Sequence, residues 1–456
     1  MILWLSCVVA LVLTYLMIAF FFRPSVAVGT VIPIAWLIPA WTSIEFSGEL
    51  LNVKVTVAIC VLCLYPFLPK ATFPVRLVPC DLAMLSLLIV HLVSDSINSG
   101  FQWTTPAFAY VEWVVPYLAG RLALQQRGDI FWIWPVLTVV ALTLTCSAIF
   151  ESWSGANPYE VFFGLRPLEG TPRDVVRWGY RRAYATCFHP LYLGVLLCWL
   201  YAWLLYPAWR GLTGRASNVW LLLPLLGIFG PLASGSRGPV LAIFVVVLGT
   251  IFCYIRKTRW GISILAVALC IAFAFIHDPL FNALDSWSGE TQHGRQLKEI
   301  ELNENIEKFS SARARITLFR IFGTPLSRAG FFGYGSGAVS TFPPNVPTGT
   351  DEIHAMRDIW SVDNTYILVT LRFGYLGLIC FLAVAVASLS QLVFVRDRQH
   401  ECSQSFFTAC LFGSTFATLV LIFTVWMPAD FGFLLIWGFG ASSGLYLLQV
   451  SPPDGS

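Results

Sequence analysis

Apolar runs long enough to form membrane-spanning helices recur along most of the chain, separated by short polar breaks. A hydrocarbon core about 30 Å thick requires roughly 20 predominantly apolar residues per helix. The runs are Ile2–Phe22, Val26–Trp41, Val53–Leu68, Leu82–Val93, Thr105–Leu118, Ile130–Phe150, Leu191–Trp209, Val219–Ala233, Val240–Tyr254, Trp260–Ile276, Tyr375–Val395, Phe406–Met427 and Phe431–Val450. Each segment in lipid must pair its own backbone groups, and no run alternates like a β-barrel strand. We therefore predict an all-α, polytopic membrane helical bundle of about 12–13 transmembrane helices.

A long polar insert interrupts this pattern between two late runs. We predict that it forms a large external, periplasmic loop domain. The predicted organisation is N-terminal transmembrane helices (1–150), an Arg-rich external loop (151–188), central helices with a small-residue turn (189–276), the insert (277–361) and C-terminal transmembrane helices (362–456).

Composition excludes an ordinary soluble domain. The chain has a mean hydropathy of +0.73 and 12% charged residues, whereas soluble domains carry about 25%. Most of the 12 cysteines lie inside apolar runs, which predicts buried free thiols. Cys60 and Cys63 have a C-x-x-C spacing, but no second pair follows. We expect no metal and no cofactor, and the absence of a basic tail argues against nucleic acid as a partner.

The orientation follows from lysine and arginine in the short loops, which favour the cytoplasmic side. Alternate loops form one basic series. Its members are Arg23, Lys70, Arg76, Arg121, Arg127, Arg210, Arg215, Arg256, Lys257, Arg259, Arg396 and Arg398. This series predicts an outward-facing N-terminus, a cytoplasmic C-terminus and a first span that is retained rather than cleaved as a signal peptide.

The first outer loop breaks this rule. It contains Arg166, Arg173, Arg177, Arg181 and Arg182, with Asp174 as the nearest acid. Guanidinium groups at this density favour recognition of phosphate, although pairing with lipid head groups explains them equally well. His189, before Pro190 at the start of the next span, either orients a substrate or bonds to the first backbone turn of that helix.

A short turn of small residues, Ser234-Gly235-Ser236-Arg237-Gly238-Pro239, lies between two spans. No acid adjoins Arg237 in sequence, and an unpaired guanidinium beside the bilayer is costly. Arg237 is therefore expected to meet either a diphosphate or a carboxylate from another segment.

The insert carries two further motifs. Gln296–Phe322 is predicted to be a helix in which Arg313 and Arg320 share one face and Arg315 points elsewhere. A glycine-rich turn, Gly330–Gly337, follows and is a weak phosphate-loop signal, since no Walker lysine accompanies it. The insert ends near His354, and Val362-Asp363-Asn364-Thr365-Tyr366 leads into the next span.

These motifs, in this order, resemble the bacterial O-antigen ligase and polymerase family over roughly residues 177–378. The carrying features are SGSRG, Arg315-x-x-x-Phe319, the Gly333/Gly335/Gly337 turn and DNTYILVTLRFGYLGL. The resemblance implies a transferase of the bacterial inner membrane that moves glycans from an undecaprenyl diphosphate carrier on the outer, periplasmic face. The resemblance also implies that Arg237 binds the diphosphate and that Arg315 supports Arg237. The other expected substrate contacts are Arg313, Arg181, Arg182, His189, Asn364, Tyr366, Gly333 and Gly335.

Family ligases usually show His-Asn where this chain has Asp363-Asn364, which favours a polymerase of exopolysaccharide or O-antigen repeat units. A base near the acceptor hydroxyl assists glycosyl transfer. Asp363 is the first candidate and His354 the second, while a helix cap at Asp363 is the structural alternative. No Asp-x-Asp pair is present, so arginines would neutralise the leaving group without a metal.

The expected partners are an undecaprenyl-diphosphate-linked glycan donor, a glycan acceptor, membrane lipids, a chain-length regulator and export machinery. The alternative function is an O-antigen ligase that transfers polymer to an acceptor such as lipid A-core. A flippase or transporter is the non-enzyme alternative. Intramembrane Glu112, His91 and Asp95 would suit a transporter, but the arginines lie in the outer loops.

Overall fold

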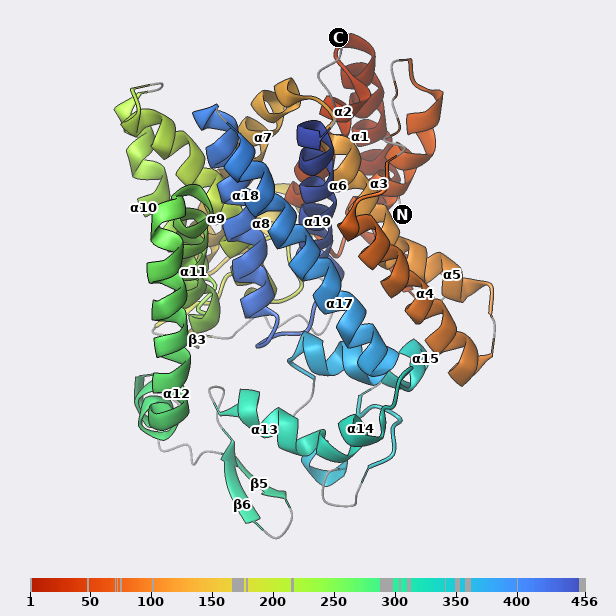
Figure 1. The fold of residues 1–456 in the computed structure, drawn as a ribbon, viewed down its shortest axis with the longest axis vertical. Helices are drawn as coiled ribbons and strands as arrows, with labels where there is room; N and C mark the ends of the chain where they lie inside the picture. The colour runs from red at the N-terminus through yellow and green to blue at the C-terminus, as the bar shows by residue number, and fades with distance from the viewer. Residues whose placement is uncertain are drawn as a thin grey trace.

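The chain folds into a bundle of long helices with a smaller polar domain at one end (Figure 1). The computed structural model describes residues 2–46, 49–69, 71, 73, 76–100, 102–165, 176–177, 179–214, 217–287, 298–302, 305–309, 313–340, 342–348, 353–356, 362–399 and 401–450. The predicted all-α membrane fold is confirmed. Several residues of interest, including Arg166, Arg173 and Asp174, lie outside the described part.

Helices cover most of each predicted apolar run. Those of the bundle are α1 (Ile2–Phe21), α2 (Pro24–Ile34), α3 (Val53–Leu64), α4 (Pro79–Ser99), α5 (Thr104–Ala109), a π-helix (Tyr110–Val114), α6 (Val115–Ala123), α7 (Ile130–Ser154), α8 (Pro158–Phe163), α9 (Pro190–Leu212), α10 (Leu223–Ala233), α11 (Arg237–Tyr254), α12 (Arg259–Trp287), α17 (Thr365–Arg398), α18 (Cys402–Leu421) and α19 (Ala429–Val450). Within the described chain, eight helices are long and apolar enough to cross a membrane, and three shorter apolar helical segments accompany them.

Three helices form the centre of the bundle. The spanning windows of α9, α18 and α19 are 83–89% buried, whereas that of α1 is 17% buried. Small residues allow the central helices to approach closely. A Cβ atom at Gly440 of α19 would lie 1.9 Å from the carbonyl oxygen of Tyr117 in α6. No larger residue fits there while the two helices keep this separation.

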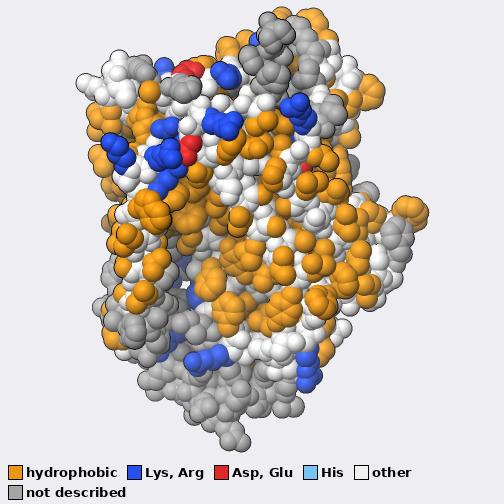
Figure 2. Space-filling model, in the orientation of Figure 1, with side chains coloured by type: hydrophobic (Ala, Val, Ile, Leu, Met, Phe, Trp, Pro, Cys, Tyr) orange, Lys and Arg blue, Asp and Glu red, His pale blue; other side chains and the backbone are white. Residues whose placement is uncertain are grey.

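The basic loops of the predicted cytoplasmic series meet at one end of the bundle. Arg121 donates to the carbonyl oxygen of Arg76, and Arg259 pairs with Asp397 at 2.7 Å. Figure 2 shows lysine and arginine gathered near the top of this face, above a mainly hydrophobic band. The insert lies at the opposite end (Figure 1).

The described part of the insert contains short helices and a hairpin. The helices are α13 (Ala314–Ile321), α14 (Gly323–Arg328) and α15 (Gly335–Val339). The prediction of one helix over Gln296–Phe322 is wrong in its first half, where β5 (Lys298–Leu302) pairs antiparallel with β6 (Asn305–Phe309). Polar and apolar residues alternate through Glu299, Ile300, Glu301 and Leu302, which is the strand period.

Two further hairpins lie nearer the bundle. β1 (Ser43–Phe46) pairs with β2 (Glu49–Asn52), and β3 (Val176–Arg177) pairs with β4 (Tyr180–Arg181). Both pairs are antiparallel. The second places the described arginines of the outer loop against the end of the bundle.

A small hydrophobic core joins the insert to α17. Leu318, Ile321 and Phe322 of the insert cluster with Ile367, Leu368 and Leu371 of α17. Gly374 then kinks α17, with φ +68° and ψ −169°. A Cβ at Gly374 would lie 2.3 Å from the carbonyl oxygen of Phe331, so the kink accepts the glycine-rich turn of the insert directly against the backbone.

One span is shorter in the structure than the sequence predicts. The run Phe406–Met427 was expected to be helical throughout, but α18 ends at Leu421. Thr365 donates from its amide to the carbonyl oxygen of Ile422 and from its hydroxyl to that of Val425. These carbonyl oxygens accept hydrogen bonds from the first residue of α17. They therefore do not continue the hydrogen-bond pattern of α18. Residues 422–427 therefore form a loop, called the α18–α19 loop below.

Candidate functional site

The α18–α19 loop is the point at which the separate sequence motifs meet. Thr365, next to the Asp363-Asn364 pair, bonds to it at 2.9 and 2.8 Å. Gly238 of the small-residue turn approaches it from the other side, since a Cβ there would lie 3.7 Å from Leu421 and 3.8 Å from Thr424. The turn that bears Arg237 and the start of α17 thus adjoin one short segment.

The Arg-rich outer loop packs directly on the small-residue turn. Arg182 donates from Nε to the carbonyl oxygen of Ser234 at 3.0 Å and from Nη2 to the hydroxyl of Ser236 at 2.9 Å. Arg177 donates to the carbonyl oxygen of Gly235 at 2.9 Å. Gly235 has φ +63°, and a Cβ there would lie 2.8 Å from Cγ of Arg182. Glycine is required both for this backbone conformation and for this contact.

These contacts gather three guanidinium groups. Burial, together with the positive charges of Arg177 and Arg237, lowers the pKa of Arg182 to about 10. In the part of the chain that the structure describes, no ion pair joins Arg182 to a carboxylate. Like charges held together in a half-buried position are stabilised by an anion, so the cluster is suited to bind one.

A cavity of about 390 Å³ adjoins the cluster. We call it the guanidinium cavity. One part of its wall is cationic and comes from Arg177, Arg181 and Arg182. The other part is mainly apolar and comes from α7 and α10, through Ile149, Ser152, Trp153, Phe229, Leu232 and Ala233. Phe229 is 56% exposed on the surface of α10. The cavity therefore has a cationic side that suits a negatively charged group and an apolar side beside the bilayer.

A buried carboxylate that sequence reasoning did not select holds the Arg-rich loop in place. Glu151, at the end of α7, is fully buried. Its Oε2 accepts from the amides of Tyr184 and Ala185 and from Nδ2 of Asn157. Ala185 has φ +42°, a conformation that costs a non-glycine residue about 1–3 kcal/mol unless neighbouring contacts fix it. The sequence signal that could have identified Glu151 is its position as an acidic residue at the end of an apolar run.

Arg181 points to a different place from Arg182. It donates to the carbonyl oxygen of Gly155, and its guanidinium lies 5.9 Å from the ring centroid of Tyr184. It reaches the guanidinium cavity as part of the wall. Its predicted contact with substrate is untested, and its described contacts also stabilise the loop.

His189 is the N-cap of α9. Its Nδ1 accepts from the amide of Leu191 at 3.1 Å, which matches the backbone-bonding alternative raised from sequence. Burial and the charge of Arg182 lower the pKa of His189 to about 4, so the ring is neutral at neutral pH. Its Nε2 then carries the proton and is a donor. The His189 ring lies 5.3 Å from Tyr192, which lies 5.8 Å from Trp426 of the α18–α19 loop.

Asn364, rather than Asp363, caps α17. Its Oδ1 accepts from the amide of Ile367 at 3.1 Å. The cap alternative for Asp363 is therefore wrong, and the half-buried carboxylate just before the cap remains a candidate base. Nδ2 of Asn364 is buried without a hydrogen-bond partner among the described residues. Tyr366 donates to the carbonyl oxygen of Leu419 at 2.7 Å, which fixes the same helix start on α18.

Helix α13 places the predicted arginines of the insert near the same loop. The ring of Phe319 lies 5.5 Å from that of Phe423. Arg313 donates to Oδ1 of Asn282 at 2.5 Å and so joins α13 to the end of α12. Arg315 is half-buried in the first turn of α13. His354 is exposed, next to the buried Ala355 and Met356 of the insert core.

The glycine-rich turn packs against α4 and α17. The amide of Tyr334 donates to the carbonyl oxygen of Leu371, and that of Ser336 donates to Oδ1 of Asp95. A Cβ at Gly333 would lie 2.5 Å from the amide nitrogen of Gly374. The amides of Tyr334 and Ser336 are thus already bonded within the protein. Substrate binding by Gly333 and Gly335 stays a prediction, and their described contacts are those of a packing turn.

His91 and Asp95 belong to the same junction. His91 Nε2 lies 3.2 Å from Oδ2 of Asp95 and 3.2 Å from the hydroxyl of Ser336. Trp113 donates to Nδ1 of His91 at 2.9 Å. Because Nδ1 accepts, Nε2 of the neutral ring carries the proton and cannot take one from Ser336. This serine, histidine and aspartate fasten the insert to α4 and do not form a nucleophilic triad.

One comparison with known proteins matches part of this chain. A family described as O-Antigen ligase matches residues 221–382. The match includes the small-residue turn, α13, the glycine-rich turn and the start of α17, while the Arg-rich loop and the α18–α19 loop lie outside it. A search of curated proteins found no match. The resemblance predicted from the motifs is confirmed: residues 221–382 of the chain match the O-antigen ligase family.

Proposed function

We propose that the protein polymerises undecaprenyl-diphosphate-linked oligosaccharide repeat units into exopolysaccharide or O-antigen on the periplasmic face of the inner membrane. Membership of the O-antigen ligase family supports membrane glycosyl transfer in polysaccharide synthesis. One observation carries the finer proposal. Arg177, Arg182 and Arg237 converge on the turn at Gly235, beside a cavity that is cationic on one side and apolar on the other.

The chemistry follows from this geometry. The acceptor hydroxyl oxygen forms a bond to the anomeric carbon of the donor glycan, and the bond from that carbon to the phosphate oxygen breaks. The electron pair leaves with the diphosphate, whose negative charge Arg237 and Arg182 stabilise, with Arg315 in support. The proton of the hydroxyl passes to Asp363. The arginines take the place of a metal, so the reaction is proposed to be metal-independent.

The neighbouring side chains have supporting tasks. His189 is neutral and donates through Nε2, so it serves as a hydrogen-bond donor to the glycan and not as the base. The unpaired Nδ2 of the buried Asn364 supplies a second donor beside Asp363. The proposed partners are the lipid-linked donor, a glycan acceptor, membrane lipids, a chain-length regulator and export machinery.

A ligase is the second candidate, because the matching family is described as O-Antigen ligase. It would transfer finished polymer to an acceptor such as lipid A-core through the same leaving-group chemistry. The two reactions differ in the acceptor and therefore in the intermediate that accumulates without the protein.

The experiment is an analysis of lipid-linked glycans in cells that lack the protein. Single lipid-linked repeat units are expected. Full-length unattached chains would replace the polymerase proposal with the ligase. Normal polymer, attached as usual, would overturn both. Complementation with the wild-type chain should restore polymer, and complementation with Arg237→Ala should not.

A further inference from the structure

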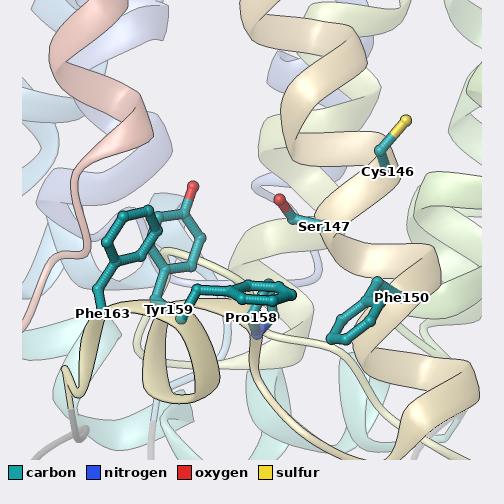
Figure 3. Close-up of a pocket in the computed structure, with 7 residues that line it drawn as sticks. Cys146, Ser147, Phe150, Pro158, Tyr159 and Phe163 are labelled. Atoms are coloured by element: carbon teal, nitrogen blue, oxygen red, sulfur yellow. The ribbon is translucent and has the colours of Figure 1, made fainter.

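A second cavity, of about 320 Å³, lies between α7 and α8 (Figure 3). We call it the aromatic cavity. It is lined by Cys146, Ser147 and Phe150 of α7 and by Pro158, Tyr159, Phe162 and Phe163 of α8. The volume falls within the range of ligand pockets, about 300–1,000 Å³. Its lining includes no charged side chain, so its ligand is hydrocarbon rather than sugar or phosphate.

The aromatic cavity and the guanidinium cavity flank the same end of α7. The residues of α7 that line the guanidinium cavity are Ile149, Ser152 and Trp153. Residues three or four apart share a helix face, so the two cavities occupy neighbouring faces of the last turns of α7. The lining of the aromatic cavity begins three residues earlier, at Cys146, which is a depth of roughly 4–5 Å along the helix away from the insert end.

The rim of the aromatic cavity is open to the surroundings of the bundle. Phe162 is 66% exposed and Phe163 is 69% exposed. Trp153, between the two cavities on α7, is 81% exposed. Large exposed apolar side chains at the end of a span lie in the interface between lipid and water. A lipid can therefore reach both cavities from the bilayer.

Packing and hydrogen-bond contacts join the wall of the aromatic cavity to the Arg-rich loop. Tyr159 in its wall packs with Trp41 and Tyr184, and the rings of Trp41 and Tyr184 are 5.8 Å apart. Tyr184 follows Arg182 by two residues. Asn157, which precedes α8, donates to the carbonyl oxygen of Ala185 at 2.9 Å. A chain that fills the cavity thus supports the loop that holds the guanidinium groups.

We propose that the aromatic cavity binds part of the isoprenoid chain of the lipid whose diphosphate lies in the guanidinium cavity. The charged head is held near the outer end of α7, and the chain lies deeper along its neighbouring face. This inference rests on the proposed function, because it takes a prenyl diphosphate as the ligand.

The test uses the full chain in phospholipid nanodiscs, with Cys63 and Cys402 replaced by serine so that the exposed Cys146 can be followed. N-Ethylmaleimide modification of Cys146 is measured by peptide mass spectrometry. Geranylgeranyl diphosphate is expected to slow it severalfold, and inorganic pyrophosphate is not. In the Arg182→Ala variant, a higher concentration of geranylgeranyl diphosphate should be needed to protect Cys146.

A matched pair of variants tests the cavity itself. Ser147→Phe fills it, whereas Ser86→Phe makes the same change at an exposed position of α4 that lines neither cavity. Ser147→Phe is expected to weaken binding of geranylgeranyl diphosphate about tenfold, which corresponds to the loss of roughly two buried methylene groups. Ser86→Phe should bind as the wild type does. Pyrophosphate binding should be unchanged in both, which also shows that both are folded.

The outcomes separate this inference from the proposed function. Arginine-dependent binding of geranylgeranyl diphosphate without protection of Cys146, or with wild-type affinity in Ser147→Phe, overturns the chain site alone. Equal protection by geranylgeraniol in the wild type and in Arg182→Ala identifies a general lipid site and overturns it too. If neither diphosphate binds in an arginine-dependent manner, the proposed function fails.

Discussion

Arg182 donates two hydrogen bonds across the small-residue turn, and its bond to the hydroxyl of Ser236 is 2.9 Å long. Ser236 is the N-cap position of α11, immediately before Arg237. The Arg-rich loop and the SGSRG turn, separated by about 50 residues in sequence, therefore form one unit. The position of Arg237 depends on a loop that lies outside the family match.

Arg237→Ala and Arg315→Ala should abolish polymer while the protein remains inserted in the membrane. Loss of one group that stabilises a developing negative charge lowers a rate about 10²–10³-fold. Polymer is measured by gel analysis in a complemented deletion strain, and protein amount by immunoblot of membranes. The matched control is Arg328→Ala, which removes an exposed arginine from α14. Normal polymer with either test variant would show that its assigned role is wrong.

Asp363→Asn should slow transfer sharply without unfolding the start of α17, because Asn364 supplies the cap. The control is Asn364→Ser, which keeps a capping side chain but loses the unpaired Nδ2. Transfer is measured with purified protein and lipid-linked repeat units, as turnover across pH. A wild-type rate in Asp363→Asn removes the carboxylate from the proton-transfer step.

Gly235→Ala should reduce both folding and activity. Its Cβ would lie 2.8 Å from Cγ of Arg182, and its φ of +63° costs an L-residue about 1–2 kcal/mol. Gly238→Ala is the matched control three residues on, since its Cβ would meet Leu421 and Thr424 only at 3.7 and 3.8 Å. Thermal unfolding in detergent measures the difference. Equal melting temperatures for the two variants would contradict this account of the turn.

The contribution of His189 to stability should fall as pH decreases through the weakly acidic range. The pKa of His189 is about 4 in the folded protein against 6.5 ordinarily, so between these values the unfolded chain binds more protons. The contribution is fully present above pH 6.5 and is lost as pH falls towards 4, by up to about 3 kcal/mol. His189→Asn keeps an N-cap acceptor but does not titrate. Its stability should vary less over that window, and an unchanged slope would assign the effect to another group.

The sequence alone determined the membrane bundle, because lipid requires long apolar helices that pair their own backbone groups. It also supplied the resemblance to the O-antigen ligase family, through the order of SGSRG, the glycine-rich turn and the segment at Asp363. Arginines in loops where insertion disfavours them pointed to Arg177 and Arg182, and both bond to the Gly235 turn. Their contact with substrate stays a prediction.

The tertiary structure decided what those motifs touch. The α18–α19 loop looked like the end of a span, because its residues are apolar; only the bonds from Thr365 to Ile422 and Val425, made across about 60 residues, show why the helix stops. The glycine-rich turn was only a weak phosphate-loop signal, and the structure packs it on the kink at Gly374. Local pattern specifies which segments are helical, whereas the partners of a backbone carbonyl or a buried carboxylate such as Glu151 come from distant segments and are fixed only by packing.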